Sequence, residues 1–81
     1  EADAVCAKIL INGGKAIVVQ GDMASETDIV SMFKTIDSEL GTITALVNNA
    51  GSVIAVRAIA DIDSSIIDRI LAVNLAGPIY C

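Results

Sequence analysis

Two short apolar runs, residues 16–20 (AIVVQ) and 43–47 (ITALV), constrain the fold of this chain most. Neither run alternates strictly between apolar and polar residues, and such continuity is typical of a strand covered on both faces in a parallel sheet. Each run ends abruptly, the first at Gly21–Asp22 and the second at Asn48–Asn49. The sequence therefore predicts two short buried strands, each opening onto polar residues.

Helical patterns flank both predicted strands. Apolar residues recur at helical spacing from residue 2 to residue 10, and the sequence Asn-Gly-Gly at 12–14 then ends that helix. Ser25 is suited to cap a second helix, with Asp28 three residues later in the manner of a capping box, and Gly41 ends it. A third helix is predicted to begin near Asp63, after a loop over residues 51–62.

The resulting order, helix-strand-helix-strand-helix, is typical of the α/β class with a doubly wound parallel sheet. Two strands do not form a stable sheet alone, and the chain is 54% hydrophobic over 81 residues. A chain of this length buries only about 60 to 65% of its unfolded surface. We therefore expect residues 1–81 to be a single incomplete segment of a larger domain.

Composition excludes several classes of function. Ten acidic and five scattered basic residues give a net charge of -5, which argues against nucleic-acid binding. No signal-peptide pattern and no long apolar run is present, so we expect a cytoplasmic protein without a membrane span. Histidine is absent and the two cysteines lack metal-site spacing, so no metal site is expected. We expect Cys6 to be a buried reduced thiol, the alternative being a disulfide partner.

The ends of the two predicted strands are the candidate ligand site. Open parallel sheets bind ligands at the carboxyl ends of their strands. There a short acid such as Asp22 can accept a hydrogen bond from an exocyclic amine, and Ala50 and Gly51 allow close approach to the backbone. The structural alternatives are a loop or helix-capping aspartate, and asparagines that satisfy backbone groups between strand ends.

Three motifs in order, "GD" at 21–22, "LVNNAG" at 46–51 and "VNLAGP" at 73–78, resemble those of the short-chain dehydrogenase/reductase family over essentially the whole chain. The resemblance implies a Rossmann-like domain, NAD or NADP as cofactor, and hydride transfer to or from an alcohol or carbonyl substrate. It also implies strand order 3-2-1-4-5-6-7, in which the two strands present here are the third and fourth and do not touch.

The resemblance also assigns cofactor-binding residues. Asp22 corresponds to the acid that bonds the adenine amino group, with the Met23 backbone beside it. The backbone of Asn48 is expected to lie along the adenosine ribose. Ala50 and Gly51 are expected to pass close to the cofactor sugars.

One catalytic residue is implied, Asn74, whose main-chain carbonyl in the family holds a water in a proton relay. Pro78 supplies an independent physical reason, because it lacks the N–H that would bond to the carbonyl of Asn74 four residues earlier. The alternative is a kink that serves packing only. The family's glycine-rich turn and its serine and Tyr-x-x-x-Lys residues are not within these 81 residues, so the chain alone is not expected to be active.

Two functions therefore stay open for the complete protein. The first is an NAD(P)-dependent oxidoreductase, and the second is a non-catalytic fold fragment or family relative that acts as an interaction or regulatory module. The family resemblance also implies a homo-oligomer through the third helix, which in the family commonly packs against its counterpart in another subunit, and this helix carries more apolar residues than one sheet face needs. These residues are Ile66, Ile67, Ile70, Leu71 and Val73.

Overall fold

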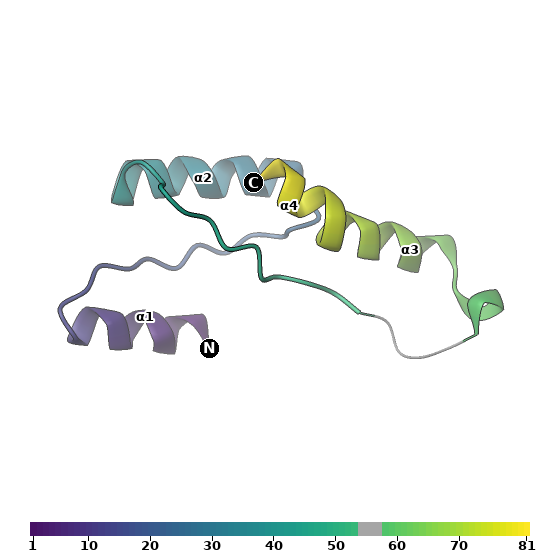
Figure 1. The fold of residues 1–81 in the computed structure, drawn as a ribbon, viewed down its shortest axis with the longest axis horizontal. Helices are drawn as coiled ribbons and strands as arrows, with labels where there is room; N and C mark the ends of the chain where they lie inside the picture. The colour runs from purple at the N-terminus through teal and green to yellow at the C-terminus, as the bar shows by residue number, and fades with distance from the viewer. Residues whose placement is uncertain (54–57) are drawn as a thin grey trace.

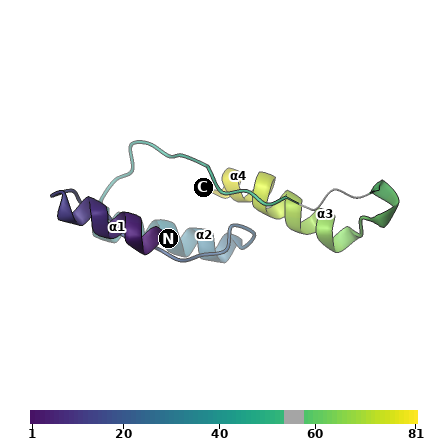
Figure 2. The same cartoon turned by 90° about the horizontal axis from the view of Figure 1, so that it is seen from below.

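The computed structural model describes residues 1–53 and 58–81 as an elongated arrangement of helices joined by extended segments (Figures 1 and 2). Its principal extents are 52 × 23 × 18 Å and its radius of gyration is 15.9 Å. A compact domain of this length has a radius of about 12 Å. The elements, in chain order, are α1 (Ala2–Ile11), α2 (Glu26–Leu40), the 3-10 turn η1 (Ile59–Asp61), α3 (Ser64–Leu71), the π-helical segment η2 (Ala72–Ala76) and α4 (Gly77–Tyr80).

The predicted helix ends are confirmed. The Ser25 side chain caps α2 by accepting the Asp28 N–H at 3.2 Å, and Gly41 ends that helix at φ 87°. After α1, Gly13 takes φ 84°, a value that glycine adopts without steric cost. Asp28 does not reach back to Ser25 as a full capping box requires, because its Oδ2 accepts the Asp22 N–H at 2.9 Å instead.

The predicted strands at 16–20 and 43–47 are not formed in the structure. Residues 14–22 and 43–53 run without regular secondary structure, and no strand occurs within 1–53 or 58–81. The physical reason is pairing, since a strand exists only where a neighbour completes its hydrogen-bond ladder. No backbone hydrogen bond joins these two segments in the described part of the chain. The helices of the predicted order helix-strand-helix-strand-helix are confirmed, and its two strands are not formed in the described residues.

The third predicted helix is present and continuous from 64 to 80, but its middle is wound as a π-helix. Asp63 caps it as predicted, accepting the Ile66 N–H at 3.0 Å. In η2 the Gly77 N–H bonds to the Ala72 carbonyl, five residues back. This π-helical widening of the helix lies just before Pro78, the residue that the sequence predicted would disturb the helix. The predicted loop over 51–62 contains η1, and its residues 54–57 lie outside the described part of the structure.

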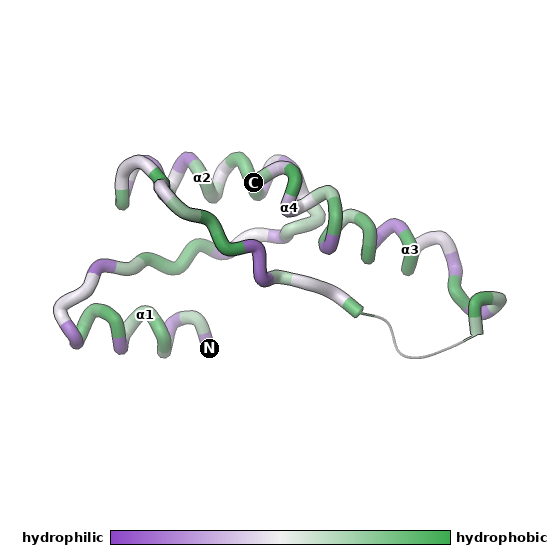
Figure 3. Tube along the Cα trace, viewed as in Figure 1, coloured by the Kyte–Doolittle hydropathy of each residue, from purple (hydrophilic) through white to green (hydrophobic). Residues whose placement is uncertain are grey.

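Little apolar surface is buried. Among the described apolar residues, only Ile29 of α2 and Val73 of η2 are buried, at 0% and 7% exposure. Figure 3 shows apolar residues along the extended segments and the helices alike. Cys6 is half-buried rather than buried, and its free thiol donates to the Ala16 carbonyl at 3.6 Å. No helix in the described ranges has the length and apolar character that crossing a membrane requires.

Candidate functional site

The helical run formed by α3, η2 and α4 contacts both polar turns that follow the apolar segments. Arg69 of α3 reaches Asp22, the Asn74 side chain of η2 reaches Ser52, and Gly77 at the start of α4 lies against the Met23 carbonyl. The Arg69–Asp22 contact joins positions 47 residues apart, and the Asn74–Ser52 contact joins positions 22 residues apart. One helix therefore holds the Asp22–Met23 turn and the Gly51–Ser52 segment on its two sides.

Asp22 is held by a dense set of hydrogen bonds. Its Oδ1 accepts the Ala24 N–H at 2.9 Å, and its Oδ2 accepts from Arg69 Nη1 at 3.0 Å. The Asp22 N–H donates to Asp28, and the Asp22 carbonyl accepts the Ser25 N–H at 2.9 Å. The hydrogen bond from Arg69, followed by that from the Ala24 N–H, holds the pKa of Asp22 below its ordinary value. The side chain is still 44% exposed, so the ionised carboxylate is accessible to an outside donor.

The carboxamide of Asn74 binds the backbone of Ser52 in both directions. Its Oδ1 accepts the Ser52 N–H at 2.7 Å, and its Nδ2 donates to the Ser52 carbonyl at 2.7 Å. An amide side chain offers a donor and an acceptor side by side, and so it can replace a neighbouring strand at one residue. The side chain of Asn74 thereby fixes the segment that follows Asn48–Gly51, in addition to the role predicted for its carbonyl.

Two glycines, Gly77 and Gly51, differ in whether the surrounding atoms leave room for a side chain. A Cβ on Gly77, which is buried, would collide with the Met23 carbonyl oxygen, and that oxygen belongs to backbone. A Cβ on Gly51 would meet only Asn74 Oδ1 among the described residues, at an ordinary contact distance of 3.4 Å, and Gly51 does not have a positive φ. Packing within the described chain therefore requires glycine at 77 but not at 51.

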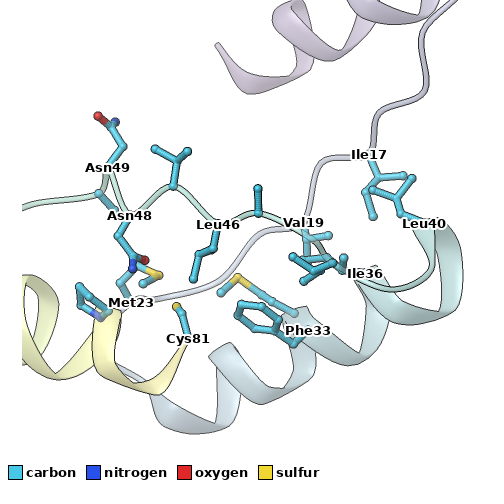
Figure 4. Close-up of a pocket in the computed structure, with 16 residues that line it drawn as sticks. Ile17, Val19, Met23, Phe33, Ile36, Leu40, Leu46, Asn48, Asn49 and Cys81 are labelled. Atoms are coloured by element: carbon cyan, nitrogen blue, oxygen red, sulfur yellow. The ribbon is translucent and has the colours of Figure 1, made fainter.

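A cavity of 490 Å³ lies between α2, the two extended segments and the end of α4 (Figure 4). Met23, Asn48 and Ala50 line one end, beside Pro78 and Cys81, and the remainder is mostly apolar. In Figure 4 the Asn48 side chain extends toward Met23, whereas that of Asn49 points the opposite way. Three of the predicted cofactor residues thus share one cavity, whose polar end lies at the Asn48 carboxamide.

The predicted residues therefore lie in three places around the helical run 64–80. Asp22 lies at Arg69, Gly51 adjoins the residue bound by Asn74, and Met23, Asn48 and Ala50 line the cavity. The sequence reasoning missed Arg69, Ser52 and Gly77. A glycine directly before a proline inside a helix was the one local signal available for Gly77.

The donors and acceptors fit a nucleotide better than a metal. No group of three or more His, Cys, Asp or Glu side chains in the described ranges is placed to hold a metal ion. The half-exposed Asp22 carboxylate can accept from an exocyclic amine, and the exposed Gly51, which has no side chain, lets a ligand approach the backbone. An accessible carboxylate and an exposed glycine backbone are groups that a nucleotide can bind.

Comparisons with a family model and with individual known proteins point to the same family. The family model described as short chain dehydrogenase matches residues 1–81. An uncharacterized oxidoreductase, YgfF of Escherichia coli, is 38% identical over 69 residues, which cover 85% of this chain and 28% of that protein. The short chain dehydrogenase/reductase dpchG of Colletotrichum higginsianum is 31% identical over 77 residues, covering 95% of this chain and 29% of that protein.

A third relative, the 3-oxoacyl-[acyl-carrier-protein] reductase of Synechocystis, is 46% identical over 50 residues, which cover 62% of this chain and 20% of that protein. The chain thus spans less than a third of the length of each of these relatives. A match over every residue, together with these relatives, identifies the chain as a member of the short-chain dehydrogenase family.

Proposed function

We propose that this chain forms one wall of the nicotinamide dinucleotide site of an oxidoreductase, which uses NAD or NADP to interconvert an alcohol and a carbonyl compound. The observation that carries the proposal is the helical run 64–80, which contacts the Asp22–Met23 turn and the Gly51–Ser52 segment together. Because these are the places where the family resemblance puts the adenosine, one helix organises both sides of the proposed site. Family membership and the names of the relatives support the same class of reaction.

Each residue has a distinct role in the proposed site. Asp22 accepts a hydrogen bond from the adenine amino group, with the Met23 backbone beside it. Asn48, Ala50 and Gly51 offer exposed backbone to the ribose, and Gly51 has room for it. The bound dinucleotide supplies the hydride chemistry, while these residues bind and orient its adenosine.

Asn74 is the catalytic residue of the proposal. The proposed proton relay needs a water held by the Asn74 carbonyl, and the residue four positions on is Pro78, which has no N–H to donate to it. The π-helical winding of 72–76 supports this role, since such winding is frequent at functional sites. In the complete enzyme we propose the doubly wound Rossmann-like sheet, with residues 16–20 and 43–47 as non-adjacent strands.

Two further features belong to the proposal. Ile67, Leu71 and Leu75 share one face of the helical run and are 46%, 51% and 56% exposed, which supports self-association of the enzyme through this helix. Cys6 and Cys81 are free thiols, which is compatible with the reducing cytoplasm proposed as its location.

The test uses the complete protein, titrated with NADH and NADPH while nucleotide fluorescence is followed, and then assayed for oxidation of the tighter-binding one by a panel of aldehydes and ketones. Binding together with carbonyl-dependent oxidation is the expected result. Binding without turnover of any carbonyl would favour the alternative of a non-catalytic module. Failure to bind either nucleotide would contradict the proposal.

A further inference from the structure

We infer that Arg69 is a positioning residue for nucleotide recognition, which fixes the Asp22 carboxylate in the orientation that accepts the adenine amino group. This inference rests on the proposed function and names a residue that neither the sequence motifs nor the comparisons point to.

The first step concerns the two oxygens of the carboxylate. Oδ1 is bonded by the Ala24 N–H from within the turn, and Oδ2 is bonded by Arg69 Nη1 from α3. With a donor on each oxygen, rotation of the carboxylate about its Cβ–Cγ bond would break a hydrogen bond. A carboxylate has about four acceptor positions, so roughly two remain for an outside donor. Arg69 therefore sets the direction in which these positions face.

The second step concerns the backbone of the same turn. Asp22 is anchored by its N–H to Asp28 Oδ2 at 2.9 Å and by its carbonyl to the Ser25 N–H at 2.9 Å. These two anchors come from within residues 22–28, whereas the hydrogen bond from Arg69 ties the Asp22 carboxylate itself to the helix that also binds Ser52. The Arg69–Asp22 pair thereby ties the adenine-recognising group to the helix that bears Asn74.

The third step asks whether stability alone explains the pair. Arg69 is 55% exposed and Asp22 44% exposed, and ion pairs between groups this exposed contribute little to folding. A guanidinium held in a fixed plane is better suited to orienting a carboxylate than a flexible ammonium is. The exposure also leaves the far side of Asp22 open to a ligand. Orientation is therefore the stronger explanation for the pair.

The test compares two nucleotides that differ at the proposed contact. One is NADH or NADPH, whichever the complete protein binds more tightly, and the other is the same dinucleotide with hypoxanthine in place of adenine. Hypoxanthine lacks the exocyclic amine, so the ratio of the two dissociation constants reports the Asp22 contact. For the wild type we expect adenine to be favoured by about 10- to 150-fold, the size of one hydrogen bond to a charged group.

Four variants separate orientation from a structural effect. Arg69→Gln is expected to bring the ratio close to one, with the affinity for the hypoxanthine analogue little changed. Arg69→Lys should keep part of the ratio, and it serves as the folded test variant if Arg69→Gln does not fold. Lys34→Gln, which removes a positive charge from the exposed side of α2, should keep the wild-type ratio. In an Asp22→Asn background, Arg69→Gln should have no further effect on the ratio.

The possible results separate the role of Arg69 from the proposed dinucleotide binding. Failure of the wild type to bind either dinucleotide would overturn the proposed function and the inference with it. Binding with a ratio near one would leave the function standing and overturn the role of Asp22. An unchanged ratio in Arg69→Gln and Arg69→Lys, equal weakening of both nucleotides, or an effect that persists in Asp22→Asn would overturn the role of Arg69 alone.

Discussion

The carboxamide of Asn74 binds both the N–H and the carbonyl of Ser52, each at 2.7 Å, and so joins η2 to the segment after Gly51. The two residues are 22 positions apart in the chain. This contact assigns the Asn74 side chain a structural task that differs from the task proposed for its main-chain carbonyl. The two tasks can be separated experimentally, because a side-chain substitution leaves the carbonyl in place.

Replacement of Asn74 by Asp is expected to loosen the Ser52 segment. The carboxylate can still accept the Ser52 N–H, but its second oxygen would face the Ser52 carbonyl where Nδ2 now donates. Loss of one hydrogen bond corresponds to about 0.5–1.5 kcal/mol, so exchange of the Ser52 amide should quicken by about 2- to 10-fold or more. Hydrogen exchange in the complete protein measures this, with Asn12→Asp, at the exposed end of α1, as the control. An unchanged exchange rate would contradict the contact.

Alanine at position 77 should lower the stability of the protein, whereas alanine at position 51 should weaken nucleotide binding. Gly77→Ala places a methyl group against the Met23 carbonyl, and overpacking of this kind costs about 1–3 kcal/mol in the free energy of unfolding. Gly51→Ala meets no such obstacle in the described chain, and should change stability by about 0.5 kcal/mol or less while weakening dinucleotide binding.

Urea unfolding and nucleotide titration of both alanine variants provide the check. Equal stability losses would show that Gly51 is also required by packing. Undiminished nucleotide affinity in Gly51→Ala would remove that residue from the proposed site.

The helix caps offer a test of local structure. Ser25→Ala removes the oxygen that accepts the Asp28 N–H, and loss of such a cap typically costs about 1 kcal/mol. Ser38→Ala, on the exposed surface of α2, is the matched control and should be neutral or slightly stabilising, because alanine is the better helix former. Equal unfolding midpoints in urea for the two variants would argue against the cap.

Stability should also depend on the ionisation of Asp63. A hydrogen bond from the Ser65 hydroxyl, and then one from the Ile66 N–H, lower the pKa of Asp63 from its ordinary value of 3.8. A lowered folded-state pKa means that the stabilisation is complete well above pH 3.8 and is lost as the pH falls through the lowered pKa. Unfolding free energies between neutral pH and the acid limit should therefore converge for wild type and Asp63→Asn as the pH falls.

The control for this pH dependence is Ser38→Ala, on the exposed side of α2, which removes no titratable group. Its stability difference from the wild type should stay constant as the pH falls. A constant difference between wild type and Asp63→Asn at all pH values would contradict the assignment to Asp63.

The sequence predicted the local features of the fold well, because these depend on neighbouring residues. Helix ends at Ser25, Gly41 and Asp63 follow from side-chain capping and from the conformational freedom of glycine, and all are found. The strands at 16–20 and 43–47 depend on partners elsewhere, and no pairing is formed in the described residues. The apolar pattern that predicted them reflects the need for cover on both faces, which the described structure does not supply.

The site was predicted in its motifs but not in its contacts. Three of the candidate residues, Asp22, Asn48 and Gly51, stand out because they follow an apolar run. Asn74 stands out because it lies four residues before Pro78. The partners Arg69 and Ser52 have no such signal, because their positions depend on how a helix far along the chain packs against the turns. Such long-range pairs are decided by tertiary structure rather than by local sequence.

Self-association through the helical run can be tested by placing a charged residue on its exposed apolar face. Leu71→Glu places a carboxylate on the exposed apolar face that includes Ile67 and Leu75. If that face joins two copies of the enzyme, sedimentation of the complete protein should show a shift to smaller species. Val30→Glu, on the exposed surface of α2, is the control and should leave the sedimentation unchanged. Identical sedimentation of wild type and Leu71→Glu would exclude this face as the interface.

The most direct test of the proposed site is a crystal structure of the complete protein with its nicotinamide dinucleotide bound. We predict that the adenine amino group lies within hydrogen-bonding distance of Asp22, that the ribose lies against the backbone of Asn48 to Gly51, and that Arg69 still bonds Asp22. A dinucleotide bound with its adenine away from Asp22, or with side chains between its ribose and Gly51, would contradict the account.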